Sequence, residues 1–286
     1  MSDITLTSSM RANLVSLQST ADLIGQTQQR LATGLKVNSP VDSPSSYFAA
    51  QEHKQRATLL SGLKDNISEA IQTINSASNG VKGILSTIES LRGIITQARS
   101  AVNDTATSAT TLSGLNDQYN SLIQQLNNLQ GDSSYKGINF LSGTSTTLTV
   151  NFNETATTKL VLSGFNASAS GLSISGGSAT GTGTLTSASL SGSTNLNSME
   201  ALLNSAIASL QTKSSELASN LAILTTRDSF LTDMINTLQD GATKLTVADT
   251  NEEGANLLTL QTRQQLGVTA LSLSAQAQQA VLRLFG

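Results

Sequence analysis

The chain has 286 residues, of which 12% are charged, 3% are aromatic and none is cysteine, and its formal net charge is −3. These values exclude disulfide stapling and thiolate metal sites, and they exclude the basic surface that binding of nucleic acid requires. Globular chains carry about 25% charged residues and fill thick cores with large aromatics, so we expect a thin core of Leu, Ile and Ala between paired helices.

The first predicted element is a helix that ends before Pro40. Its apolar residues recur at alternating steps of four and three, which is a heptad pattern. The members are Met10, Leu14, Leu17, Ala21, Ile24, Leu31 and Leu35, with Gln28 as the polar exception. Both prolines of the chain, Pro40 and Pro44, follow it. Because proline removes a backbone donor and restricts the preceding residue, residues 39–46 are predicted to form an extended joint.

A long second helix is predicted from about Ser45 to Val102, roughly 80 Å at 1.5 Å per residue. Its later part keeps a strict apolar stripe, made of Val81, Ile84, Ile88, Leu91, Ile95, Ala98 and Val102. A polar turn region, TATSATTLSG, precedes a third helix with the stripe Leu115, Tyr119, Leu122, Leu126 and Leu129. A helix of this length exceeds the diameter of a small domain, so the predicted fold is mainly α, an elongated rod of long antiparallel helices.

The middle of the chain, residues 142–195, consists largely of Ser, Thr and Gly, and its only charges are Glu154 and Lys159. Leu148, Val150 and Phe152 alternate with polar residues, and a polar turn and a second short alternation follow. This pattern predicts a small β-hairpin within the Ser/Thr/Gly-rich middle.

A fourth helix is predicted from the stripe Leu217, Leu221, Leu224, Leu231, Ile235, Leu238, Ala242 and Leu245, which Asp228 interrupts. Asp228 either fixes the register of the helix or lies at the edge of the stripe. The last helix is predicted from about Gly254, with the stripe Leu266, Ala270, Leu273, Ala277, Ala280 and Leu284.

The stripes at the two ends of the chain have the same period and comparable length, so we expect the two terminal helices to pair as a coiled coil. From Gln264 to Leu282 the last helix carries no charge on any side, which is typical of a buried helix. One partner covers only part of its circumference. We therefore expect other copies of the chain to bury the rest, and a repeated heterologous contact of this kind builds an open filament.

The sequence offers little for catalysis, and we expect no catalytic, cofactor or metal site. His53 is the only histidine, which excludes a His-Glu-x-x-His zinc site, and no Gly-x-Ser-x-Gly motif accompanies it. Asp249, Glu252 and Glu253 form an acidic cluster without EF-hand spacing. Their position at the start of the last helix favours helix capping over calcium binding. Polar residues within the uncharged C-terminal run argue against a membrane span.

Several segments in this order resemble bacterial flagellins. On the N-terminal side these are QQRLATGLKVNSPVDSPSSYFAAQ, LRGIITQA and NDQYNSLIQQLNNLQGDSSYKGINFL, and on the C-terminal side the stretch from RDSFLTDMINTLQDG to AVLRLF. The resemblance covers roughly residues 1–141 and 196–286. The opening MSDITLTSSMRANL resembles flagellins of alphaproteobacteria in particular.

The resemblance implies a division of the chain into four parts. Residues 1–38 with 250–286 would form the inner-core coiled coil, disordered in the free monomer, and residues 39–46 a connecting spoke. Residues 47–165 with 196–249 would form the outer-tube rod with the hairpin. Residues 166–195 would be a short variable segment on the surface.

The resemblance also implies a place and partners. The chain would polymerise into the extracellular flagellar filament for swimming motility, after leaving the cell through the flagellar type III export apparatus with a chaperone. Hook-associated proteins and the filament cap would be further partners. We expect no cleavable signal peptide, because the N-terminal stretch lacks a cationic region followed by an apolar run.

Two positions depart from flagellins that the vertebrate innate receptor detects. Those flagellins carry an arginine two positions before the one matching Arg92, and a glutamate in the third helix. Ser90 and Gln118 stand there in this chain. The resemblance therefore implies weak or absent activation of the receptor.

Two other functions stay open beside the filament subunit. A hook–filament junction protein would share the terminal helices and differ in copy number. A surface adhesin would bind carbohydrate through the middle segment, although Phe152 and Phe165 are its only aromatics. An enzyme is the weakest interpretation, because the middle is short and lacks a metal-binding motif.

Overall fold

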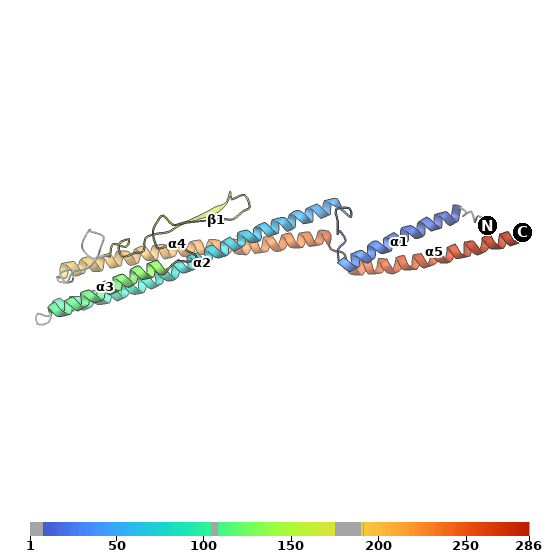
Figure 1. Cartoon of the computed structure of the whole chain (residues 1–286). Coiled ribbons are helices and arrows are strands. Elements are labelled where there is room, and N and C mark those ends of the chain that lie inside the picture. Colours follow the sequence, from blue (N-terminus) through green and yellow to red (C-terminus); the bar gives the residue numbers. More distant parts are fainter. Residues whose placement is uncertain (1–7, 104–107, 175–189, 191, 286) are drawn as a thin grey trace. The chain divides into compact units, whose positions relative to one another are not determined.

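The computed structural model describes residues 8–103, 108–174, 190 and 192–285, with no side chains described beyond residue 280 (Figure 1). Within this part, five α-helices and one two-stranded antiparallel sheet follow in the order α1 (Ser8–Thr33), α2 (Pro44–Val102), α3 (Ser108–Asp132), β1 (Thr147–Asn151), β2 (Lys159–Ser163), α4 (Ser193–Thr246) and α5 (Thr250–Phe285). The mainly α fold with a small hairpin in the middle is confirmed. The chain divides into two compact units, residues 1–57 with 236–286 and residues 58–235.

The core of the second unit lies between three long helices. Every position of the predicted stripe on α2 from Val81 to Ala98 is almost completely buried. The α4 stripe repeats at intervals of seven, through Leu196, Leu203, Leu210, Leu217, Leu224 and Leu231, all buried. Arg99 of α2 forms an ion pair with Glu200 of α4 at 2.7 Å, and Ser68 donates to Asp228 across the same pair at 3.5 Å. These contacts make α2 and α4 antiparallel. Asp228 lies half-buried at the edge of the stripe.

Two predicted boundaries were wrong. Residues 108–114, expected in a polar turn, form the first two turns of α3, because Leu112 is buried and anchors them. Pro44, expected in the extended joint, is the first residue of α2. That position suits proline, since the first helical residue needs no N–H donor and the ring presets the helical φ.

The hairpin has the predicted alternation. Leu148 pairs with Leu162 and Val150 pairs with Leu160, and Val150 and Leu162 are buried. Upstream of it, the side chain of Asn139 organises the end of α3. Its Nδ2 donates to the carbonyls of Gln130 and Gly131, and its Oδ1 accepts from the Leu141 N–H at 2.8 Å. Asn139 therefore satisfies carbonyls that the helix end leaves open.

Downstream of the hairpin, the chain is tied to α3. The hydroxyl of the buried Tyr119 donates to the Ile174 carbonyl at 3.3 Å, and the Asn127 side chain accepts from the Ala169 N–H at 2.9 Å. Burial raises the pKa of Tyr119 well above its usual value, so this hydroxyl stays a donor. Residues 175–189 of the predicted variable segment lie outside the described residues.

In the first unit, α1 and α5 form an antiparallel pair. Arg30 near the end of α1 contacts Glu253 in the first turn of α5 at 3.1 Å, and Leu17 near the start of α1 lies against Gly267 further along α5. The predicted pairing of the two terminal helices is confirmed. Asp249 precedes α5 and accepts from the Asn251 and Glu252 N–H groups at 2.9 and 3.3 Å, which confirms its predicted capping role.

A short set of backbone hydrogen bonds follows α1. Gly34 adopts a φ of +69°, the left-handed conformation that glycine provides at helix ends. The N–H groups of Lys36 and Val37 then donate to the Thr246 carbonyl, and the Ala248 N–H donates to the Gly34 carbonyl. These bonds hold the segment that follows α1 against the end of α4.

The carboxylate of Asp42 stabilises the turn within the joint between α1 and α2. It accepts from the Asn38 and Ser39 N–H groups at 3.0 and 2.9 Å and from the Ser39 hydroxyl. The Ser39 N–H is the largest cause that lowers the pKa of Asp42 below its usual 3.8, followed by the Asn38 N–H.

We expect the joint to loosen in acid. A carboxylate whose pKa is lower in the folded than in the unfolded chain stabilises the fold above its unfolded pKa, and this contribution is lost as the pH falls through the folded value. Hydrogen exchange at the Asn38 and Ser39 amides should therefore accelerate below pH about 3.8 relative to amides of α2. In Asp42→Ala the same amides should exchange fast at every pH. Unchanged protection in that variant would contradict the role of Asp42.

Candidate self-assembly surface

The inner side of the terminal pair is where α1 and α5 meet. On α1 the buried or half-buried residues are Met10, Asn13, Leu17, Thr20, Ile24, Thr27, Arg30 and Leu31. On α5 they are Glu253, Gly254, Leu257, Leu260, Gly267, Leu271, Ser274, Ala275 and Gln278. Both sets keep heptad spacing, and both include small or polar members. This side is therefore a narrow seam with limited apolar content.

The predicted stripe on α5 lies on another face of the helix, about 100° away. Its described members, Leu266, Ala270, Leu273, Ala277 and Ala280, are all exposed, and the two leucines have exposed fractions of 66% and 68%. The expectation that this stripe packs against α1 within one chain was therefore wrong. The backbone of Leu284 continues the helix, but its side chain lies outside the described part.

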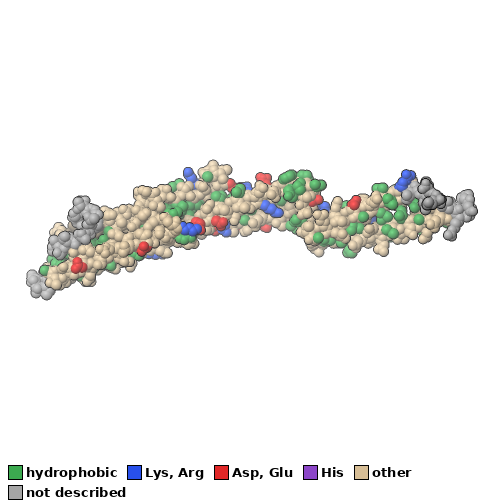
Figure 2. All heavy atoms as spheres, in the orientation of Figure 1, with side chains coloured by type: hydrophobic (Ala, Val, Ile, Leu, Met, Phe, Trp, Pro, Cys, Tyr) green, Lys and Arg blue, Asp and Glu red, His purple; other side chains and the backbone are tan. Residues whose placement is uncertain are grey.

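The predicted stripe on α1 divides between two surfaces. Met10, Leu17, Ile24, Leu31 and Leu35 are buried or half-buried, whereas Leu14 and Ala21 are exposed. Val15 and Leu23 add further exposed apolar side chains on this helix. Figure 2 shows apolar side chains on the surface of the α1–α5 pair, close to the chain ends.

Sequence reasoning missed the inner seam because it followed the most apolar register. The heptad that starts at Met10 also fits a second register through Asn13, Thr20 and Thr27. The three polar side chains made that register look unfavourable, although a helix with a small, partly polar seam can pair closely. The signal in α5 was Gly267, a residue that brings two helix backbones near each other.

The outer stripe, defined as Leu266, Ala270, Leu273, Ala277 and Ala280, has the chemistry of an interface. Large exposed apolar patches mark sites of interaction between proteins. No charged residue lies between Gln264 and Ala280, so neither repulsion nor desolvation of charge opposes burial of this stretch. Its surface can associate with another apolar helix and offers no group for covalent chemistry.

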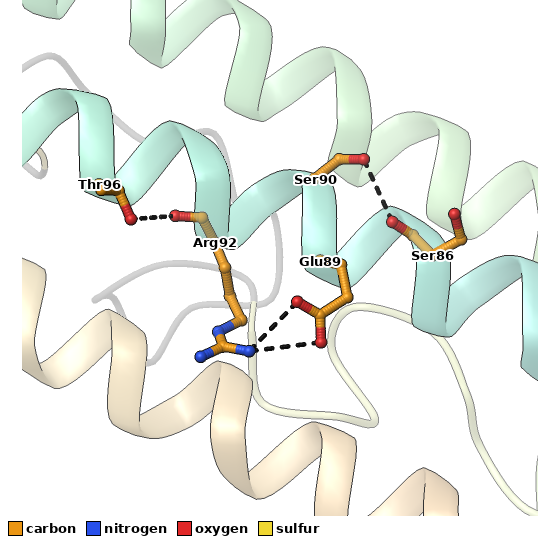
Figure 3. A network of polar contacts seen from close by, with 5 residues as sticks. All are labelled: Ser86, Glu89, Ser90, Arg92 and Thr96. Atoms are coloured by element: carbon orange, nitrogen blue, oxygen red, sulfur yellow. Dashed lines mark hydrogen bonds and ion pairs between the residues drawn. The ribbon is translucent and has the colours of Figure 1, made fainter.

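The remaining predicted positions are apart from this surface. Ser90 and Gln118 are both exposed, on α2 and α3. Figure 3 shows the Ser90 hydroxyl donating to the Ser86 carbonyl at 3.1 Å, with the Glu89–Arg92 ion pair formed by residues on either side of Ser90 in the sequence. His53 is half-buried and faces Gly241, where an added Cβ would lie 3.7 Å from the ring. In the described segments no cluster of acidic or histidine side chains could hold a metal, and no described helix has the length and apolarity to cross a membrane.

The fold defines a class of helical proteins built around their paired termini. Its features are long helices with a heptad pattern, an antiparallel pair made from the two ends of the chain, and an inserted hairpin. Residues 4–146 match the family model of the bacterial flagellin N-terminal helical region, and residues 194–285 match that of the bacterial flagellin C-terminal helical region. The chain belongs to the bacterial flagellin family.

Among curated proteins, the chain is similar to the flagellins FljN and FljO of Caulobacter vibrioides. Each is 28% identical over 125 residues, which cover 44% of this chain and 44% of the relative. The match therefore spans less than half the length of these relatives. Caulobacter is an alphaproteobacterium, so the predicted alphaproteobacterial type is confirmed.

Two solved structures are also similar. A putative flagellar hook-associated protein from Vibrio parahaemolyticus matches with a TM-score of 0.57 at 13% identity, covering 72% of this chain and 100% of that one. A flagellin from Bacillus cereus matches with a TM-score of 0.46 at 18% identity, covering 58% of this chain and 88% of that one. The first likeness shows a shared helical fold.

Proposed function

We propose that this protein is the structural subunit of a flagellar filament and polymerises through its terminal helices. The outer stripe of α5 carries the proposal, because its leucines are exposed in the single chain and water is an unfavourable environment for them. Membership of the flagellin family supports the same conclusion. The protein would act by packing against its own copies and not as an enzyme.

The proposed assignment of the chain follows from this function. Residues 1–38 with 250–286 would line the interior of the filament, residues 39–46 would connect, and residues 47–165 with 196–249 would form the outer tube. Residues 166–195 would be the variable segment, in which Ala167, Ala169, Ile174 and Leu190 are buried and the exposed part lies among the other residues. The chain would leave the cell through the flagellar export apparatus with the help of a chaperone. The polymer would be extracellular and would contact hook-associated proteins and the filament cap.

Electron microscopy of the purified full chain at high concentration tests the proposal. We expect helical filaments from the protein alone, and none from a chain lacking residues 267–286, which removes most of the outer stripe. Circular dichroism should show that the truncated chain loses only the helical signal of the deleted turns. Normal filaments from the truncated chain would contradict the proposal.

We also propose that this flagellin evades the vertebrate innate receptor. Ser90 and Gln118 are exposed, so they are accessible to a binding protein, and they replace the arginine and glutamate of detected flagellins. Purified monomer should give a weak signal in reporter cells, and the double substitution Ser90→Arg with Gln118→Glu should raise it. Full potency of the unmodified monomer would contradict this proposal.

A further inference from the structure

Between residues 264 and 280, helix α5 carries apolar residues on two faces about 100° apart, and apolar burial along this stretch does not select the face that meets α1. The outer stripe holds two leucines and three alanines. The inner residues of the same stretch are Gly267, Leu271, Ser274, Ala275 and Gln278. Along this stretch, turning the outer stripe towards α1 would bury more apolar area within one chain, which is favourable in itself. Nearer the start of α5, however, Leu257 and Leu260 are half-buried in the rotation observed. The residues that hold α5 in the rotation observed therefore lie nearer the start of the helix.

The inner side of α1 selects this rotation only weakly. Thr20 and Thr27 are buried there, and the Thr20 hydroxyl donates to the Ser16 carbonyl of its own helix at 2.8 Å. It therefore makes no directional bond to α5. A heptad repeat also offers similar packing after a shift of seven residues, so apolar contacts alone specify register poorly.

The ion pair between Arg30 and Glu253 is the contact that a rotated or shifted α5 would lose. The Arg30 Nη1 lies 3.1 Å from the Glu253 Oε1, and only 8% of the Glu253 side chain is exposed. A carboxylate at this depth needs a partner, because desolvation without one is costly. One residue of helix rotation, about 100°, would move Glu253 out of this position.

The contact between Leu17 and Gly267 agrees with the same rotation. A Cβ on Gly267 would lie only 2.7 Å from the Leu17 Cδ2, so a larger residue at 267 would require the Leu17 side chain to shift. The same rotation by one residue would bring Leu266 to this place. The close approach therefore reports the rotation that the ion pair fixes.

We propose that the Arg30–Glu253 ion pair is a rotational lock that keeps the outer stripe of α5 directed away from α1. The lock leaves that stripe free for other copies of the chain, although neither charged residue belongs to it. This inference rests on the proposed function. Removing the lock should let α5 satisfy its outer stripe within its own chain, and assembly should then fail.

Engineered disulfides can report the rotation, since the chain has no cysteine of its own. Leu17→Cys with Gly267→Cys reports the observed rotation, and Leu17→Cys with Leu266→Cys reports the rotated state. Each pair is introduced into the natural chain and into a chain with Arg30→Met and Glu253→Met. Apolar replacement of both partners of a buried ion pair preserves stability or raises it, so this background separates positioning from stability. The control background is Glu252→Met with Arg263→Met, which changes the same charges at exposed residues of α5.

Under oxidising conditions that favour polymerisation, the intramolecular 17–267 disulfide should exceed the 17–266 disulfide at least tenfold in the natural and control backgrounds. With Arg30→Met and Glu253→Met this ratio should approach one, and filament yield should fall at least tenfold at unchanged helical content. A natural ratio and natural yield in this background would overturn the inference. If the natural chain failed to polymerise, the proposed function would fail, while the disulfide ratio would still decide the lock.

Discussion

Replacing Leu266 and Leu273 together with glutamine is expected to abolish polymerisation and leave the fold of the single chain intact. Both residues are more than 60% exposed, so the substitutions remove little contact within the chain. Glutamine keeps a helix propensity close to that of leucine. The lost quantity is the apolar area that a neighbouring copy would bury. Sedimentation and electron microscopy measure the polymer, and circular dichroism measures the fold.

The matched control for this experiment is Val161→Gln in β2. Val161 is also an exposed apolar residue, but it lies on the hairpin and away from the terminal helices in the sequence. Its substitution should leave filament yield within about twofold of the natural chain, since single exposed apolar residues are ordinary features of protein surfaces. Unimpaired polymerisation of the Leu266/Leu273 variant would rule out the outer stripe as an assembly surface.

Gly80→Ala is expected to destabilise the second unit, although alanine is the better helix former. A Cβ at this position would lie 2.0 Å from the Ser133 Oγ, 2.6 Å from the Ser133 Cβ and 2.6 Å from the Leu141 Cδ1. Leu141 is completely buried and cannot move aside. Overpacking of this kind costs about 1–3 kcal/mol, which exceeds the gain of about 1 kcal/mol from helix propensity.

Gly62→Ala on the same helix is the control, because nothing lies within 4 Å of a Cβ added there. The substitution is then governed by helix propensity, and it should raise the free energy of unfolding by about 0.5–1 kcal/mol. Urea unfolding followed by circular dichroism compares the two variants. Equal stabilisation by both alanines would show that α2 is not packed closely against Ser133 and Leu141.

Long apolar stripes and the hairpin could be predicted from the sequence because each has a period that a single register satisfies. The stripe from Val81 to Ala98 has no competing register, and α2 buries all of it. Leu148 and Val150 alternate with threonine, which leaves one way to place them on a sheet face. These are local patterns, and the local pattern decides the structure when one side of the element is much more apolar than the other.

The inner seam of the terminal pair could not be predicted in this way. Helix α5 offers two apolar sides, and the choice between them depends on Arg30, which is more than two hundred residues away in the chain. The cap that Asn139 places on α3 likewise depends on how the chain turns back at Lys136 and Gly137, both of which have positive φ. Periodicity contains no information about either contact.

The two-sided character of α5 also has a consequence for how this sequence can change over evolutionary time. A helix with one buried side tolerates polar substitutions on the rest of its circumference. On α5, by contrast, one face must keep its contacts with Leu17 and Arg30, and the outer stripe must stay apolar. Only the remaining part of the circumference, which includes Gln261 and Gln265, is left to vary. Saturation mutagenesis of α5 should therefore reveal intolerance at about twice the density found in a helix of ordinary amphipathic design.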